Sequence, residues 1–262
     1  MSYGSGNSGD YKKLKGQMIQ VTDTDPVVYA GAWSSGGSLN TARRRVGAAG
    51  IQTAAIAFGG SSDPPVRANA EQYDGTSWTE VGDLNTAREA MGPSSKGSQT
   101  AVLAAGGNPI TTANELWDGS SWTEVGDINT GREGLGGGGT STAAFVAGGT
   151  TATARQVLSE TWDGSSWTEV SEVNTARINV MGGISNSSIG LIFGGTPGAK
   201  SETESWNGSS WTEINDLSTG VSDGGGCGTS VAALCFGGKS PPVVANTEEF
   251  TADATLSTVT VS

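Results

Sequence analysis

Residues 114–134 read "NELWDGSSWTEVGDINTGREG", and close variants of this stretch begin at positions 70, 159 and 203. The tryptophans at the centre of these stretches are spaced 44, 45 and 44 residues apart, at Trp78, Trp122, Trp167 and Trp211. Double glycines mark five units at a similar spacing: Gly59-Gly60, Gly106-Gly107, Gly148-Gly149, Gly194-Gly195 and Gly237-Gly238. A fixed period of this length indicates a repeat architecture.

Each unit contains four short segments and shows no helical periodicity. They are the "LNTAR" stretch, an apolar run ending in Gly-Gly, a segment ending in an aromatic residue, and "SWTEV" or "SWTEI". Asp-Gly or Asn-Gly between the last two segments favours a tight hairpin. The apolar run has no polar face, so both faces of its strand must be buried. We therefore predict an all-β fold of four-stranded antiparallel blades arranged radially, a β-propeller.

The order of residues in each unit resembles the kelch repeat, a four-stranded propeller blade. In the second unit the resemblance rests on Arg88, Gly106, Gly107, Glu115, Trp117, Asp118 and Trp122. It covers residues 38 to about 251 and departs from the pattern in the fifth unit, where Val221 replaces the arginine and no tryptophan follows "EEFTADA". The resemblance implies a propeller and leaves function open, because kelch propellers serve as enzymes, adaptors and adhesins.

The repeats predict five blades, with units at about 38–83, 84–127, 128–172, 173–216 and 217–262. Both chain ends offer a further fourth strand, one at Trp33 and one in the C-terminal "TLSTVTVS". Residues 16–37 are therefore expected to close the ring or attach to a partner; six blades, with this segment supplying most of the sixth, is the alternative. Residues 1–15 are rich in glycine and serine and are predicted to form a flexible arm.

Composition excludes several classes of function. The 262 residues carry a net charge of -12, which argues against nucleic-acid binding. The absence of histidine removes the commonest general base and metal ligand. No apolar run approaches the roughly 18 residues of a membrane span, and the N-terminus lacks a signal peptide, so we expect a soluble protein made in a cytoplasm. Cys235, within "VAALCFGG", is expected to be a buried thiol.

One arginine recurs in each of the first four units, and a ring of guanidinium groups near an axis can bind an acidic ligand. The four residues are Arg43, Arg88, Arg132 and Arg177. We expect them on the innermost strands in a structural role. Their expected partners are main-chain carbonyls or the repeated glutamates Glu80, Glu124, Glu169 and Glu213.

Repeated carboxylates argue against catalysis, because an acid/base pair requires a singular arrangement. The recurring carboxylates are Glu115, Glu160, Glu204, Asp83, Asp127 and Asp216. The "DGSSW" turns also lack the dense carboxylates of calcium loops. We predict no catalytic residue, no metal and no cofactor.

The segments that follow each Gly-Gly vary in length and contain most of the prolines. Variable loops on a rigid scaffold are where binding specificity usually lies. Their charged tips are the predicted binding residues: Arg67, Arg155, Lys200 and Lys239.

A second resemblance concerns the "DGSSW"-rich repeats and residues 15–33, "KGQMIQVTDTDPVVYAGAW". These are similar to pieces of phage tail and fibre proteins and to kelch-type repeats in virion proteins of marine phages. The resemblance implies a non-enzymatic tail, fibre or capsid-decorating component located in the virion. Its implied partners are other virion proteins, copies of itself, or a host-surface glycan or receptor. A lectin-like carbohydrate-binding propeller is the alternative, followed by a glycoside-cleaving enzyme.

Overall fold

The computed structural model describes residues 11–14, 17–20, 35–62, 64–93, 97–239 and 243–252, and every regular element in these ranges is a β-strand. Within them, no helix has the length and apolar content needed to cross a membrane.

The chain divides into two units, Met1–Ser35 and Gly36–Ser262. In the first unit, β1 (Tyr11–Leu14) pairs antiparallel with β2 (Gln17–Gln20). Residues 11–14, predicted to belong to a flexible arm, therefore form a strand. The strand predicted around Trp33 and the C-terminal strand within 253–262 lie outside the described residues.

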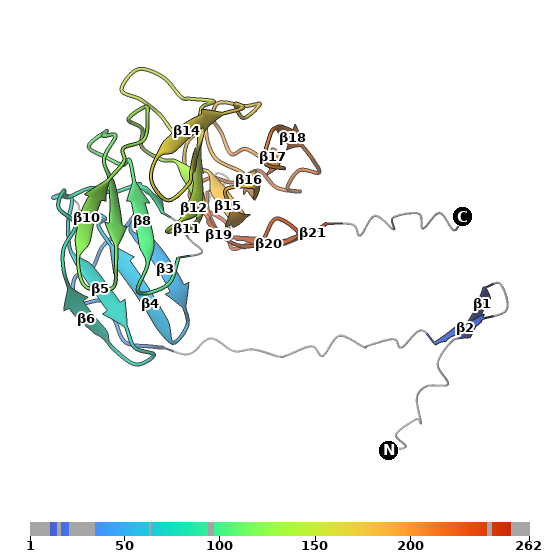
Figure 1. The fold of residues 1–262 in the computed structure, drawn as a ribbon, viewed down its shortest axis with the longest axis horizontal. Coiled ribbons are helices and arrows are strands. Elements are labelled where there is room, and N and C mark those ends of the chain that lie inside the picture. Colours follow the sequence, from blue (N-terminus) through green and yellow to red (C-terminus); the bar gives the residue numbers. More distant parts are fainter. Residues whose placement is uncertain are drawn as a thin grey trace, which may run out of the picture. The chain divides into compact units, whose positions relative to one another are not determined.

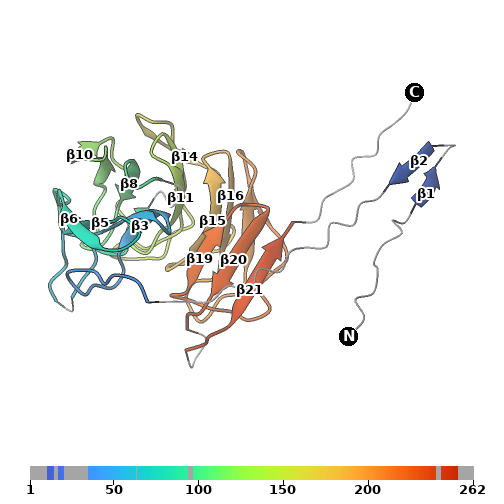
Figure 2. The same cartoon turned by 90° about the horizontal axis from the view of Figure 1, so that it is seen from below.

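The second unit confirms the predicted five-bladed β-propeller (Figure 1). From the innermost strand outward, the first two sheets are β3 (Gly47–Ile51), β4 (Ala54–Phe58), β5 (Ala70–Tyr73), β6 (Trp78–Val81), and β7 (Gly92–Pro93), β8 (Val102–Ala105), β9 (Asn114–Trp117), β10 (Trp122–Val125). The next two are β11 (Gly136–Thr140), β12 (Ala143–Ala147), β13 (Ser159–Trp162), β14 (Trp167–Val170), and β15 (Met181–Asn186), β16 (Ile189–Phe193), β17 (Thr203–Trp206), β18 (Trp211–Glu213). In the fifth sheet, the described residues form β19 (Gly225–Gly228), β20 (Ala232–Phe236) and β21 (Thr247–Thr251), which lie side by side in Figure 2.

The innermost strands are glycine-rich segments, and the prediction that "LNTAR" forms the first strand is wrong. β11 has the sequence GGGGT, and its counterparts in the first and fifth blades are GAAGI and GGCG. Space explains this composition: a Cβ on Gly47 would lie 2.2 Å from the Phe58 ring, and one on Gly136 would lie 3.1 Å from the Val180 side chain. The "LNTAR" segments instead connect each outer strand to the next blade.

The second strands of the second, third and fourth blades, such as β8, are buried on both faces, as their apolar sequences predict, whereas β20 of the fifth blade has exposed residues. Val102 and Ala104 of β8 belong to a buried cluster that includes Phe58 of the first blade. Leu103 and Ala105 of the same strand pack with the third blade. Alternate side chains of one strand therefore join two neighbouring blades.

Tryptophans complete the interfaces farther from the axis. Trp117, Trp162 and Trp206 are among the largest fully buried side chains. On the outer strands, the Trp122 ring centroid lies 4.8 Å from that of Phe58, and the Trp211 centroid lies 5.5 Å from that of Phe145. These phenylalanines belong to the preceding blade, so the outer tryptophans Trp122 and Trp211 each pack against the blade before their own.

The fifth and first blades differ from the other neighbours. In the part of the chain that the structure describes, four buried clusters join consecutive blades, and none joins the fifth blade to the first. Phe236 of β20 is 42% exposed, whereas Phe58 and Phe193, at the equivalent strand position, are 0% and 3% exposed. We call the boundary between β20 and the first blade the seam.

Candidate functional site

The four repeated arginines lie in the connectors that enter each blade, rather than on the innermost strands predicted for them. In the third blade, Arg132 Nη1 donates to the carbonyl oxygens of Gly148 (2.7 Å) and Leu158 (2.9 Å). Its Nη2 donates to Glu160 Oε1 (2.5 Å), and Glu160 Oε2 accepts bonds from the main-chain and side-chain nitrogens of Asn129. The equivalent ion pairs are Arg43–Glu71 (2.6 Å), Arg88–Glu115 (3.0 Å) and Arg177–Glu204 (2.7 Å).

The carbonyl contacts expected for these arginines are present, but the predicted glutamate partners Glu80, Glu124, Glu169 and Glu213 are wrong. Glu169 lies directly opposite Glu160 in the sheet, one strand farther out, and remains exposed. The Arg132 side chain extends from the entry connector to the third strand of the blade, which carries Glu160, whereas Glu169 is on the fourth strand. Burial lowers the pKa of Arg132 from its ordinary value, while Glu160 opposes this shift. Because all four arginine side chains are 0% exposed, they form no ring of cations open to a ligand.

The variable loops and the entry connectors lie at the same end of the blades. In an antiparallel sheet, the loop after the second strand and the connector into the first strand share one end. Isolated bridges join them, as between Glu133 and Thr150 in the third blade and between Ser222 and Lys239 in the fifth. One face of the propeller, here named the axial face, therefore presents all the variable loops.

Five residues with left-handed backbone follow these bridges and form what we call the axial collar. They are Arg45, Ala90, Gly134, Asn179 and Asp223, with φ between 53° and 63°. Main-chain hydrogen bonds link Ala90 N to Arg45 O (3.3 Å), Gly134 N to Ala90 O (2.9 Å) and Asn179 N to Gly134 O (2.8 Å). Asn179 Nδ2 continues the series to Asp223 Oδ1 (2.7 Å). The backbone repeats from blade to blade, but all five side chains differ.

The collar and the innermost strands line a cavity of about 540 Å³. Its wall is apolar, with Val46, Met91, Leu135, Val180 and Met181 among the lining side chains. A volume of this size falls within the roughly 300–1,000 Å³ typical of small-molecule sites. Four of the five collar residues are not glycine, and each left-handed conformation costs roughly 1–3 kcal/mol.

Charges at the collar are arranged without symmetry. Arg45 Nη1 lies 3.3 Å from Glu89 Oε1, and the buried Glu89 also accepts a hydrogen bond from Ser61 Oγ (2.5 Å). Asp223 accepts bonds from Asn179 and from Ser222 Oγ (3.0 Å). Arg45 and Asp223 thus place opposite charges at equivalent collar positions, where the other three blades have neutral residues.

The four loop residues predicted from the sequence differ in their availability. Arg155 and Lys239 are exposed. Arg67 is half-buried, and its Nε donates to Ser62 Oγ (3.3 Å). Lys200 Nζ lies 2.7 Å from Glu202 Oε1. Arg155 and Lys239 are therefore the two predicted binding residues most accessible to a partner on the axial face.

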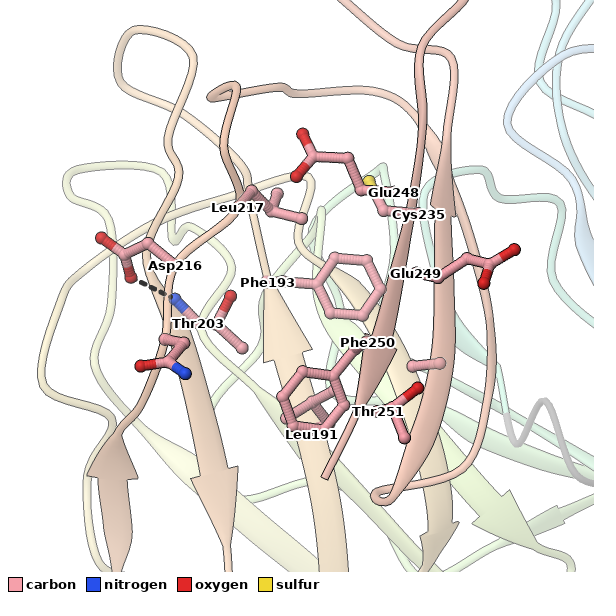
Figure 3. A pocket seen from close by; sticks show the side chains of 12 residues that line it. Leu191, Phe193, Thr203, Asp216, Leu217, Cys235, Glu248, Glu249, Phe250 and Thr251 are labelled. Carbon is pink, nitrogen blue, oxygen red and sulfur yellow. Dashed lines mark hydrogen bonds between the residues drawn. The ribbon is translucent and has the colours of Figure 1, made fainter. Parts of the chain in front are cut away.

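A cavity of about 210 Å³ lies between the fourth and fifth blades (Figure 3). Leu191, Phe193 and Phe250 line its apolar part, and Glu248 and Asp216 line its edge. We call this cavity the inter-blade slot. This slot was not predicted from the sequence. The feature that could have indicated it is the absence of a tryptophan after "EEFTADA" in the fifth unit.

Acidic residues that repeat in the sequence are held in contacts within their own blades. Glu115, Glu160 and Glu204 belong to the buried arginine pairs. Ser120 and Ser121 donate to Asp118 at the hairpin turn and lower its pKa to about 2. Over the ranges that the structure covers, no three acidic or cysteine side chains converge as metal ligands would.

The two cysteines differ in their exposure to solvent. Both are free thiols; Cys227 is exposed and Cys235 is buried, as predicted for Cys235. Burial, with a smaller effect from Glu248, raises the pKa of Cys235 to about 11.

Because the thiolate is the reactive form, we expect a thiol reagent at pH 8 to label Cys227 alone in the native protein. Mass spectrometry of the labelled protein, with Cys227→Ser as control, checks this; rapid native labelling of Cys235 would contradict it.

The fold and these cavities define a five-bladed β-propeller with a polar collar at one end of its axis. No protein-family model matches this chain, and no curated protein sequence matches it.

Proposed function

We propose that this chain is a non-enzymatic, kelch-type binding propeller and a tail, fibre or capsid-decorating component of a bacteriophage particle. The observation that carries the proposal is the distribution of its charged residues. The repeated arginines and glutamates are buried in pairs within blades. Charged residues that differ between blades, such as Arg45, Arg155, Asp223 and Lys239, lie on the axial face.

The axial face has the properties of a binding surface on a rigid scaffold. Strands hold the start and end of each variable loop, while the loop sequences differ. Arg155 and Lys239 supply exposed cations there. Such a face suits a partner that carries carboxylates or other acidic groups. The partners we propose are other virion proteins, further copies of this chain, or a glycan or receptor on the host surface.

Resemblance of the repeats to virion proteins supports placement in the particle. The lectin alternative has less support, because the recurrent aromatic rings Trp117, Trp162 and Trp206 are buried between blades. The buried pairing of the repeated glutamates likewise favours binding over glycoside cleavage.

Retention on particles tests the proposal. We expect the chain to remain with purified virions through a density gradient at a constant copy number. The double variant Arg155→Ala/Lys239→Ala should change stability by no more than about 0.5 kcal/mol, because both side chains are exposed, and should reduce retention several-fold.

Lys200→Ala serves as the matched loop control, because the Lys200 ammonium is already paired with Glu202. It should leave retention unchanged. Recovery of the wild-type chain only as a free monomer, or turnover of a glycan substrate, would count against the proposed function.

A further inference from the structure

The cavity lined by the axial collar, here called the axial cavity, is built in three layers along the entry to each blade. The five collar residues form its mouth. The residue that follows each of them forms the second layer, which consists of Val46, Met91, Leu135, Val180 and Gly224. The second residues of four innermost strands form the third layer, which consists of Ala48, Gly137, Gly182 and Gly226. All five blades therefore contribute to one site.

Small residues keep the third layer of the cavity open. Ala48, Gly137, Gly182 and Gly226 occupy equivalent positions in their strands, and none has a side chain larger than a methyl group. Glycine in the interior of a strand weakens the strand and often marks a place where a ligand or another backbone approaches closely. A leucine at any of these lining positions would take up part of the cavity volume of about 540 Å³.

The second layer gives the axial cavity an apolar wall. Met91 and Leu135 are each 5% exposed and Val180 is 8% exposed, so these side chains are held by packing within the protein. Met181, the first residue of β15, also lines the cavity and is buried. Methionine has an unbranched, polarisable side chain that adapts to the shape of a neighbouring group. The wall therefore suits the apolar part of a ligand.

The charges at the mouth of the cavity are not balanced. The Arg45 guanidinium is paired with the buried Glu89 carboxylate, with 3.3 Å between Nη1 and Oε1. The Asp223 carboxylate is exposed and accepts hydrogen bonds from two neutral groups, Asn179 Nδ2 (2.7 Å) and Ser222 Oγ (3.0 Å). No ion pair in the described part of the chain includes Asp223. One negative charge at the mouth is therefore left without a cation.

The main chain of the collar also favours a ligand that donates hydrogen bonds. The N–H groups of Ala90, Gly134 and Asn179 each donate to the carbonyl oxygen of the preceding collar residue. These donors are used within the collar, whereas each carbonyl oxygen can still accept a second hydrogen bond. A ligand that reaches the mouth therefore meets main-chain acceptors in the same collar as the Asp223 carboxylate.

We infer that the axial cavity binds a small amphipathic cation, whose ammonium group is held by Asp223 and whose apolar chain lies against Met91, Leu135 and Met181. An ammonium group has three donors and no acceptor, which fits the carboxylate and the collar carbonyls. The cation can be a free amine or the lysine side chain of a partner, since both present an ammonium group on an alkyl chain. No residue of the variable loops lines the cavity, so this site does not depend on the particle function proposed above.

Methionine methyl groups report on the site directly. Of the four methionines, Met91 and Met181 line the axial cavity, whereas Met1 and Met18 belong to the first unit. In protein labelled with carbon-13 at these methyl groups, n-octylammonium chloride should shift the Met91 and Met181 NMR signals in a saturable manner and leave the other two unchanged. Sodium octanoate should bind about tenfold more weakly, because Asp223 repels its carboxylate.

Asp223→Asn should raise the Kd of n-octylammonium about tenfold, because the hydrogen bond to the ammonium group loses one of its two charges. Asparagine tolerates the left-handed backbone at this position and can still accept the hydrogen bond from Asn179, so the collar should stay folded. Ala48→Leu, which takes up cavity volume without removing a charge, should raise the Kd by a similar factor. Glu169→Gln is the matched control: it removes an exposed carboxylate from an outer strand and should leave the Kd unchanged.

Equal binding of octanoate and n-octylammonium to the wild-type protein would overturn the inference, and this comparison does not depend on how the variants fold. An unchanged Kd in Asp223→Asn would also overturn it. Equal losses of affinity in Asp223→Asn and Glu169→Gln would do the same, by reducing the effect to general charge attraction. N-acetyl-lysine methylamide identifies the source of the cation: binding as tight as that of n-octylammonium assigns it to a partner's lysine, and weaker binding assigns it to a free amine.

Discussion

Replacement of Arg132 by methionine is expected to lower the free energy of unfolding by about 3–5 kcal/mol. The substitution leaves the Glu160 carboxylate buried without its cation and removes the donors to the carbonyls of Gly148 and Leu158. Asn129 still donates to Glu160 Oε2 but supplies no compensating positive charge. Urea denaturation followed by tryptophan fluorescence measures the loss.

The double variant Arg132→Met/Glu160→Gln separates charge burial from packing. It removes both charges, and we expect it to recover most of the stability lost by the single variant, because a buried pair contributes little beyond the neutral alternative. Arg155→Met, on an exposed loop, should change stability by no more than about 0.5 kcal/mol. A loss below 1 kcal/mol in Arg132→Met would show that Glu160 is not held as a buried anion.

The repeated part of the fold was predictable because it depends on local chemistry. Asp118-Gly119 marks a hairpin turn, and an apolar run such as residues 102–105 specifies a strand buried on both faces. The period then sets the number of blades. Glycine-rich inner strands such as Gly136–Thr140 were missed because glycine carries no hydrophobic pattern; their composition is explained only by the close approach of neighbouring elements.

The candidate site was predictable only in part. Variation among the loops indicates the end of the blades where Arg155 and Lys239 are exposed, and their role in binding stays a prediction. The axial collar was not predictable, because left-handed backbone at residues such as Arg45 and Asn179 is imposed by tertiary hydrogen bonds. The choice of Glu160 over Glu169 as the partner of Arg132 also depends on which strand the arginine reaches first, which a repeat pattern does not encode.

Trp162→Ala is expected to lower the free energy of unfolding by about 3–5 kcal/mol, an amount comparable to the effect of Arg132→Met. Trp162 is 1% exposed and packs in the cluster that joins the second and third blades. Its Nε1 also donates to the carbonyl oxygen of Ser141 (3.0 Å), so truncation creates a cavity and removes this part-buried hydrogen bond. The change in urea midpoint, converted with the wild-type m-value, gives the loss.

Tyr73→Ala is the matched comparison, because Tyr73 occupies the same position of the third strand in the first blade. Tyr73 is only half-buried, since its blade faces the seam rather than a fully packed neighbour. Hydrophobic stabilisation scales with the apolar area removed from water. Tyr73→Ala should therefore lower the free energy of unfolding clearly less than Trp162→Ala does, by a margin larger than the smaller ring of tyrosine alone explains. Equal losses from the two substitutions would contradict this expectation and would mean that the seam is packed as tightly as the other blade interfaces.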